Sequence, residues 1–148
     1  MKGFDEKNLG YFGEKYELKV INQIIGTNEQ KSKGQYRRDC KFGRKVLPII
    51  SADHFTHSLA KRIVVFMKNY FNRMNDVPYY DTISEYVKAR VPDEVEQEMV
   101  LTYLDDIKHV DTQDNMWIQE NTLNFINTKN LHSVFKKIEN EYINRGKY

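Results

Sequence analysis

Two stretches in the last third of the chain have apolar residues at spacings of three and four. The first stretch runs from Asp93 to Val110 and the second from Asp114 to about Arg145. Such spacing places the apolar residues on one face of a helix, so we expect two helices here. Their apolar faces consist of Val95, Met99, Tyr103, Leu104, Ile107 and Val110 in the first, and of Trp117, Leu123, Ile126, Leu131, Val134, Phe135, Ile138 and Tyr142 in the second.

These two expected helices are close in sequence but differ in length. The residues between them, Asp111 to Asp114, are enough only for a tight turn, which predicts that the helices pack antiparallel against each other. At about 1.5 Å per residue the first is about 27 Å long and the second about 46 Å. The second helix therefore projects past the first, and an apolar face on that projection needs a cover. The sequence leaves two covers open, the earlier helices of the same chain or another chain. The projecting apolar residues are Leu131, Val134, Phe135, Ile138 and Tyr142.

Four further helices are predicted earlier in the chain, after an irregular arm over residues 1–13. They cover Glu14 to Ile25, Asp39 or Cys40 to Ile50, His57 to Met74, and a short segment that begins at Asp81 or Thr82. No stretch alternates apolar and polar residues as a strand does, and the polar stretch from Gly26 to Gly34 is expected to be an exposed loop. The sequence thus predicts an all-α fold. It is a compact bundle of about six helices over residues 14–148, with a long projecting C-terminal helix.

Several residues mark expected helix ends. Gly26 is suited to the left-handed conformation that ends the first helix. Pro48 is expected to kink or shorten the second helix because proline has no backbone N–H, and Ser51 is expected to cap the short turn that follows. Pro92 suits the first position of the fifth helix, with Asp93 in the first turn, where the helix dipole favours an acid.

The composition is that of a helical globular protein. The 148 residues are 40% apolar and include ten Tyr and eight Phe, enough to build a core without disulfides. The single cysteine, Cys40, cannot form an internal disulfide, which favours a reducing cytoplasm. No apolar run approaches the roughly 18 residues of a membrane span, and no secretion signal follows Met1. We expect a cytoplasmic protein that does not contact a membrane.

The net charge is only +2, but its distribution is uneven. Residues 31–45 contain seven bases and one acid, whereas residues 93–120 contain nine acids and one base, and such asymmetry can steer association. The basic segment also interleaves aromatic residues with cations, as contacts to single-stranded nucleic acid often do. The alternative is a solvated loop and helix face, with Tyr36 and Phe42 in the core. The candidate nucleic-acid-binding residues are Arg37, Arg38, Lys41, Arg44 and Lys45.

Catalytic and metal-binding patterns are not found. A P-loop would require a glycine-rich stretch before Lys-Ser or Lys-Thr, and the only Gly-Lys pair, Gly146-Lys147, is followed by Tyr148. His54 and His57 are three residues apart, but zinc needs three or four convergent ligands, so we interpret them as capping or surface histidines. The sequence therefore predicts no catalytic residue, metal or cofactor in this segment.

The order and spacing of the predicted helices resemble the N-terminal domain of DnaB-type replicative DNA helicases, most closely the branch carried by large tailed phages. The resemblance covers about Glu14 to Tyr148. It is carried by the phrases from Val46 to Phe55, from Asn75 to Pro78 and from Trp117 to Phe125, the last leading into the long helix.

This resemblance implies a non-catalytic domain in DNA replication that forms a collar on a helicase ring. The implied partners are other helicase subunits in a dimer or ring, a primase and a helicase loader, with single-stranded DNA as a further candidate. The parent protein would be an ATP-dependent helicase whose ATPase domain is absent here, in the host cytoplasm if a phage encodes it. The interface would be the projecting apolar residues of the last helix. One departure is the basic insertion from Asn28 to Lys41, which is longer than the family leads us to expect.

Overall fold

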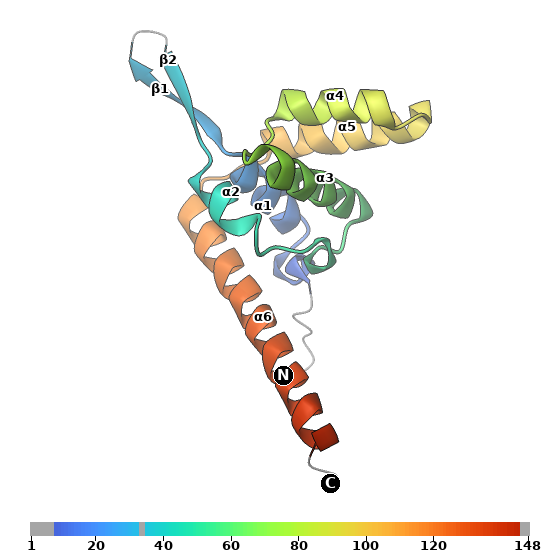
Figure 1. Ribbon diagram of the computed structural model, residues 1–148. Coiled ribbons are helices and arrows are strands. Elements are labelled where there is room, and N and C mark those ends of the chain that lie inside the picture. The colour runs from blue at the N-terminus through green and yellow to red at the C-terminus, as the bar shows by residue number, and fades with distance from the viewer. Residues whose placement is uncertain (1–7, 33–34, 146–148) are drawn as a thin grey trace.

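The computed structural model describes residues 8–32 and 35–145 (Figure 1). This part of the chain is mostly helical, as predicted, with six α-helices and one short β-hairpin. The elements in chain order are the 3-10 helix η1 (Leu9–Phe12), α1 (Tyr16–Ile25), β1 (Thr27–Ser32), β2 (Gln35–Asp39), α2 (Lys41–Val46), the 3-10 helix η2 (Ala52–His54), α3 (Ser58–Met74), α4 (Tyr80–Arg90), α5 (Glu94–His109) and α6 (Asn115–Arg145).

Helix α1 is the centre of the body. It packs against η1, α2, α3, α5 and α6, and most of its side chains are buried. Its sequence explains this position, because apolar residues at adjacent positions as well as at spacings of three and four cover more than one face. The helix ends at Ile25, and Gly26 caps it with φ 86° and ψ 178°; this is not the predicted left-handed helical conformation, but it has the positive φ that glycine adopts without a steric penalty.

Helices α4 and α5 pack together and project from one side of the body (Figure 1). The Gln97 side chain joins the pair, because its Nε2 donates to the carbonyl oxygens of Lys88 and Val91 at the end of α4. Asp93 is the N-cap of α5 and accepts a hydrogen bond from the Val95 N–H. Pro92 therefore lies before the cap, not at the first helical position as predicted.

The predicted antiparallel pairing of the last two helices is wrong. Helix α5 packs against α4 and α1, whereas α6 packs against α1 and then leaves the body as a rod (Figure 1). A short connection brings the end of one helix near the start of the next, but it does not fix the angle between them. Here α1 packs against both helices. The two helices that were predicted to contact each other therefore both contact α1 instead.

The predicted loop after Gly26 is also wrong, because β1 and β2 pair antiparallel there, with Thr27 opposite Asp39 and Gln30 opposite Tyr36. The hairpin extends away from the helices (Figure 1). Its ladder consists of backbone hydrogen bonds, which require no apolar alternation when neither face of the ribbon packs on a core. A search of the sequence for alternating apolar and polar residues therefore does not identify these two strands.

Two predicted boundaries near the N-terminus need correction. The arm over residues 1–13 is not irregular throughout, since Leu9–Phe12 forms η1 and Leu9 is fully buried; residues 1–7 lie outside the described part. Helix α2 ends at Val46 rather than at Ile50. The shortening has the predicted cause, because Pro48 lies two residues after Val46 and has no N–H to continue the helix.

Candidate interaction surface

Helix α6 is divided into a covered and an uncovered half. In the half nearer the body, Ile118, Thr122, Phe125 and Ile126 are buried. From Leu131 to Arg145 every residue is exposed. We call residues 131–145 the distal half of α6. None of the described residues outside α6 covers it.

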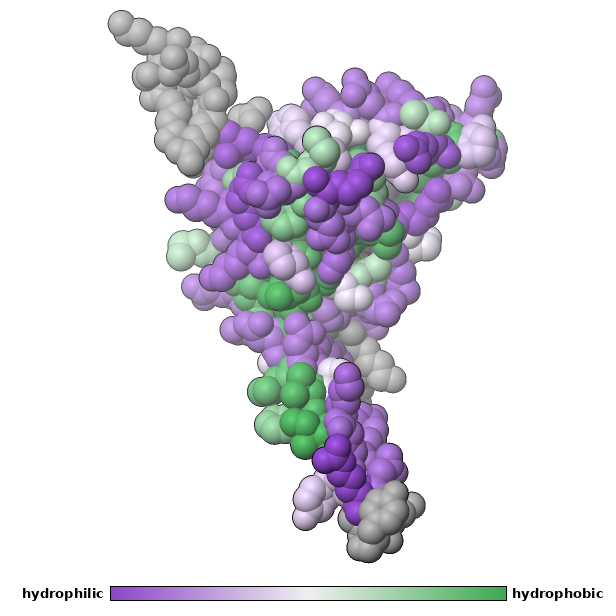
Figure 2. Space-filling view, in the orientation of Figure 1, coloured by the Kyte–Doolittle hydropathy of each residue, from purple (hydrophilic) through white to green (hydrophobic). Residues whose placement is uncertain are grey.

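The distal half carries the apolar residues that the sequence singled out. Phe135 is 62% exposed and Ile138 is 56% exposed, although both are large side chains that are usually buried. Figure 2 shows hydrophobic residues gathered along one side of the rod. The full exposed set is Leu131, Val134, Phe135, Ile138, Tyr142 and Ile143, of which the sequence had identified all but Ile143.

The exposed stripe and the buried face lie on opposite sides of α6, so the prediction that Ile126 shares one face with Leu131 and Ile138 is wrong. A helix advances about 100° per residue, and by this measure Leu131 and Ile138 lie about 120° to 180° around the axis from Thr122 and Ile126. The body therefore holds α6 by one face and leaves the other free. An open depression lies along the distal half, lined by His132, Phe135, Lys136, Ile138, Glu139, Tyr142 and Ile143.

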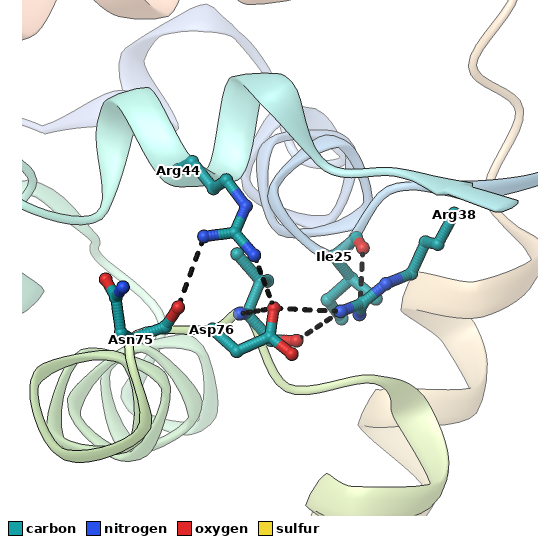
Figure 3. Close-up of polar contacts among 6 residues, drawn as sticks. Ile25, Arg38, Arg44, Asn75 and Asp76 are labelled. Atoms are coloured by element: carbon teal, nitrogen blue, oxygen red, sulfur yellow. Dashed lines mark hydrogen bonds and ion pairs between the residues drawn. The ribbon is translucent and has the colours of Figure 1, made fainter.

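Two of the predicted nucleic-acid-binding residues have another role. The guanidinium groups of Arg38 and Arg44 converge on Asp76 at the start of the α3–α4 connection, with the Arg44 contact at 2.8 Å and the Arg38 contact at 3.8 Å (Figure 3). Arg38 also donates to the carbonyl oxygens of Ile25 and Val77, and Arg44 to that of Asn75. We call this group the arginine clamp. It fixes the base of the hairpin and α2 to the end of α3.

The remaining basic candidates are dispersed. Lys41 and Lys45 are exposed on α2, and the side chain of Arg37 lies outside the described part. Lys45 lines an open groove together with Glu120 of α6. The fold thus brings basic and acidic segments of the sequence next to each other, which reduces the asymmetry seen along the chain.

The two histidines near η2 are capping residues, as predicted. His54 Nδ1 accepts from the Ser51 N–H while the Ser51 hydroxyl accepts from the Asp53 N–H, and His57 Nδ1 accepts from the Leu59 N–H at the start of α3. Among the described residues, no three His, Cys, Asp or Glu side chains are placed to hold a metal ion, and Cys40 is a half-buried free thiol.

The same part of the chain contains no helix both long and apolar enough to cross a membrane. Comparisons with family models, with curated proteins and with solved structures found no match to this chain.

A second exposed apolar face lies on α5, where the sequence predicted burial. Val95 is 68% exposed and Met99 is 55% exposed, while the buried residues of α5 are Val100, Leu104 and Ile107. The predicted apolar set therefore mixed two faces of the helix. The signal that separates them is Val100, which the prediction left out and which shares the buried face with Leu104 and Ile107.

Proposed function

We propose that this chain is a non-catalytic assembly domain of the kind found at the N-terminus of DnaB-type replicative helicases, where it joins subunits into a collar and recruits a primase or a loader. The observation that supports this function is the uncovered distal half of α6. A soluble monomer rarely exposes such a continuous apolar face without a partner for it.

The distal half suits a contact with another chain. Its large apolar side chains are half to three-quarters exposed, so covering each would contribute roughly 1 to 2 kcal/mol before the costs of association. Phe135 and Tyr142 are aromatic residues of the type that concentrates binding energy at interfaces. Because the body occupies the opposite face of α6, a partner helix can lie along the stripe without meeting the body.

Sedimentation velocity on variants of the distal half tests this function. Phe135→Asp and Ile138→Asp place a charge in the stripe, and we expect each to weaken self-association at least tenfold with unchanged helix content by circular dichroism. Met74→Asp is the matched control, because Met74 is 58% exposed on α3, away from the stripe. Unchanged sedimentation of both stripe variants would count against the proposal.

Nucleic-acid binding by residues 37–45 is the weaker candidate, because Arg38 and Arg44 are held in the arginine clamp. It still predicts binding of single-stranded DNA that weakens steeply with salt and depends on Lys41 and Lys45.

A further inference from the structure

A polar pocket lies where the end of α1, the base of the hairpin, α2 and the start of α6 meet (Figure 1). Its volume is about 180 Å³, and its lining residues are Gln23, Gly26, Asp39, Lys41, Phe42, Asn115 and Gln119. Most of these residues carry a side-chain amide or a charge, which suits a polar ligand. Because Asp39 and Lys41 are exposed, the pocket reaches the surface of the molecule.

The amides of this pocket belong to a chain of hydrogen bonds that begins in the core. Asn22 Nδ2 donates to the carbonyl oxygen of Ile107, which can only accept, so this bond fixes which way the Asn22 amide points. Gln23 Nε2 donates to Asn22 Oδ1 at 3.2 Å and to Asn115 Oδ1 at 3.0 Å. Gln119 Nε2 in turn donates to Gln23 Oε1 at 2.7 Å. A backbone carbonyl therefore determines the orientation of all four amides.

This chain of amides ends in one available donor and one available acceptor. Asn115 uses its Oδ1 and Gln119 its Nε2, so Asn115 Nδ2 and Gln119 Oε1 have no hydrogen-bond partner among the described residues. Both residues line the pocket, and they lie one turn apart on α6. Gln23, which holds them both, is only 6% exposed. The pocket thus presents a donor and an acceptor that are oriented before any ligand binds.

The volume of the pocket limits the ligand to one small ring. A cavity of about 150 Å³ holds a benzene molecule, so this pocket has room for a six-membered ring with small substituents. A ligand that pairs with both free groups needs an acceptor next to a donor on one edge. The pyrimidine bases of nucleotides have such an edge, whereas purines have a second, fused ring.

Asp39 favours one pyrimidine over the others. The amino group of cytosine carries two hydrogens, which can pair with Gln119 Oε1 and with the Asp39 carboxylate, while the cytosine N3 accepts from Asn115 Nδ2. Uracil and thymine have a single N–H on this edge, between two carbonyl oxygens that a carboxylate repels. Lys41 lines the same pocket, and its ammonium group suits the phosphate of a nucleotide.

We propose that this pocket binds a cytosine base, with Asn115 donating to N3 and with Gln119 and Asp39 accepting from the amino group. The base can come from a free nucleotide or from a single-stranded nucleic acid, because both present the same edge and a phosphate. The proposal does not depend on the assembly role of α6, since the pocket and the distal half lie at opposite ends of that helix.

Titration with cytidine 5′-monophosphate, followed by NMR, tests the proposal. We expect the side-chain amide signals of Asn115 and Gln119 to shift, and that of Asn130, an exposed residue further along α6, to stay in place. Uridine 5′-monophosphate should bind about tenfold more weakly, because its edge has a different pattern of donors and acceptors. Equal affinity for the two nucleotides, or no shift with either, would overturn the proposal.

An oligonucleotide of deoxycytidine identifies the source of the base. If it binds more tightly than the free nucleotide and shifts the same two amide signals, the base belongs to a single strand. If it binds more weakly, the ligand is a free nucleotide. If it binds without moving these signals, its contact lies elsewhere and a single strand is excluded as the source.

Asn115→Asp is the most specific variant, because aspartate keeps the oxygen that accepts from Gln23 and replaces only the free donor by a second acceptor. We expect it to weaken binding of cytidine 5′-monophosphate at least tenfold, with helix content unchanged by circular dichroism. Asn130→Asp makes the same change at an exposed site of the same helix and should leave binding unaltered. Full affinity in Asn115→Asp would show that this pocket is not the site.

Two variants of exposed residues test the remaining contacts without disturbing the core. Asp39→Asn keeps the oxygen that accepts from the Lys41 N–H and should reduce the preference for cytosine over uracil severalfold. Lys41→Ala should weaken binding of cytidine 5′-monophosphate severalfold but leave cytidine unaffected, because cytidine has no phosphate. An unchanged preference in the first variant, or equal losses for both ligands in the second, would contradict the roles assigned to Asp39 and Lys41.

Discussion

The two halves of α6 have similar side chains but opposite environments. Ile126 in the half near the body is fully buried, whereas Ile138 in the distal half is 56% exposed. The helix is continuous across both. Apolar periodicity therefore tells us that a helix face needs a cover, but the position of the other helices decides whether the same chain provides it. In this protein the body covers one face of the first half, and the stripe of the distal half lies on the opposite side of the helix, where none of the described residues outside α6 covers it.

The largest expected effect is a difference in stability between two variants that truncate an isoleucine to alanine, one in each half of α6. Ile126→Ala should lower the free energy of unfolding by about 2 to 5 kcal/mol, because it leaves a cavity at a fully buried site. Ile138→Ala should change it by no more than about 0.5 kcal/mol, since the site is exposed.

Urea unfolding measures both isoleucine variants, at protein concentrations low enough that self-association does not add to stability. Similar losses in the two variants would mean that the distal half is also covered within one molecule. The division of α6 into two halves would then be wrong.

A smaller loss of stability is expected from removing the hydroxyl of Tyr16, a residue of α1 that contacts the covered half of α6. Tyr16 Oη lies 2.7 Å from Thr122 Oγ1 and donates to the carbonyl oxygen of Ile118, while the Asn121 amide donates to it at 3.1 Å. Tyr16→Phe removes these hydrogen bonds, among them the one to the buried Thr122 hydroxyl, and should cost about 1 to 2 kcal/mol.

Tyr142→Phe is the matched control for Tyr16→Phe, because Tyr142 is 78% exposed, and it should leave the unfolding midpoint unchanged. A midpoint shift of equal size in the two variants would show that the Tyr16 hydroxyl does not anchor α6.

Much of the secondary structure is predictable from the sequence because local signals determine it. The bounds of α3, α5 and α6 follow from apolar spacing and from capping residues such as His57 and Asp93, which act within a few residues of the helix end. The cap at Ser51 and the break at Pro48 follow for the same reason.

The packing of those helices is less predictable, because it depends on competition between faces. Val95 and Met99 share a spacing pattern with Leu104 and Ile107, but only the latter two meet α1 and the rest of the core. Hydrogen bonds between buried polar side chains and distant segments are also difficult to predict, because they too depend on how the helices pack. Glu17 is only 4% exposed, and its carboxylate accepts from the N–H groups of Thr56 and His57 about 40 residues away.

The two candidate surfaces also differ in how far the sequence predicts them. The distal stripe of α6 is predictable from apolar spacing in a helix that is too long for the body to cover, although the pairing with α5 that the prediction assumed is wrong. The role of Arg38 and Arg44 is not predictable, because Asp76 lies more than 30 residues further along the chain and only the fold brings it between them. A run of bases in the sequence says nothing about which of them are already paired.

The smallest expected effect is a pH dependence of stability that arises from His54, a residue in contact with the covered half of α6. The His54 ring packs edge-on against Phe125 of α6, with centroids 5.8 Å apart, and its Nδ1 accepts from the Ser51 N–H. Burial lowers the pKa of His54 from its ordinary value of 6.5; the positive charges of Lys68 and Lys129 lower it further, against a smaller opposing effect of Asp53.

The unfolded chain therefore binds a proton at His54 more readily than the folded chain does. Stability should fall as the pH drops below about 6.5 and level off below the lowered pKa of the folded state. His54→Gln keeps an acceptor for Ser51 but cannot titrate, so urea unfolding between pH 7.5 and pH 5 should show a shallower loss of stability than in the unaltered chain. His132→Gln, in the distal half, should leave the loss unchanged because His54 is still present. If the loss is as steep after His54→Gln, protonation at the contact between η2 and α6 does not control it, and the pH dependence arises elsewhere in the molecule.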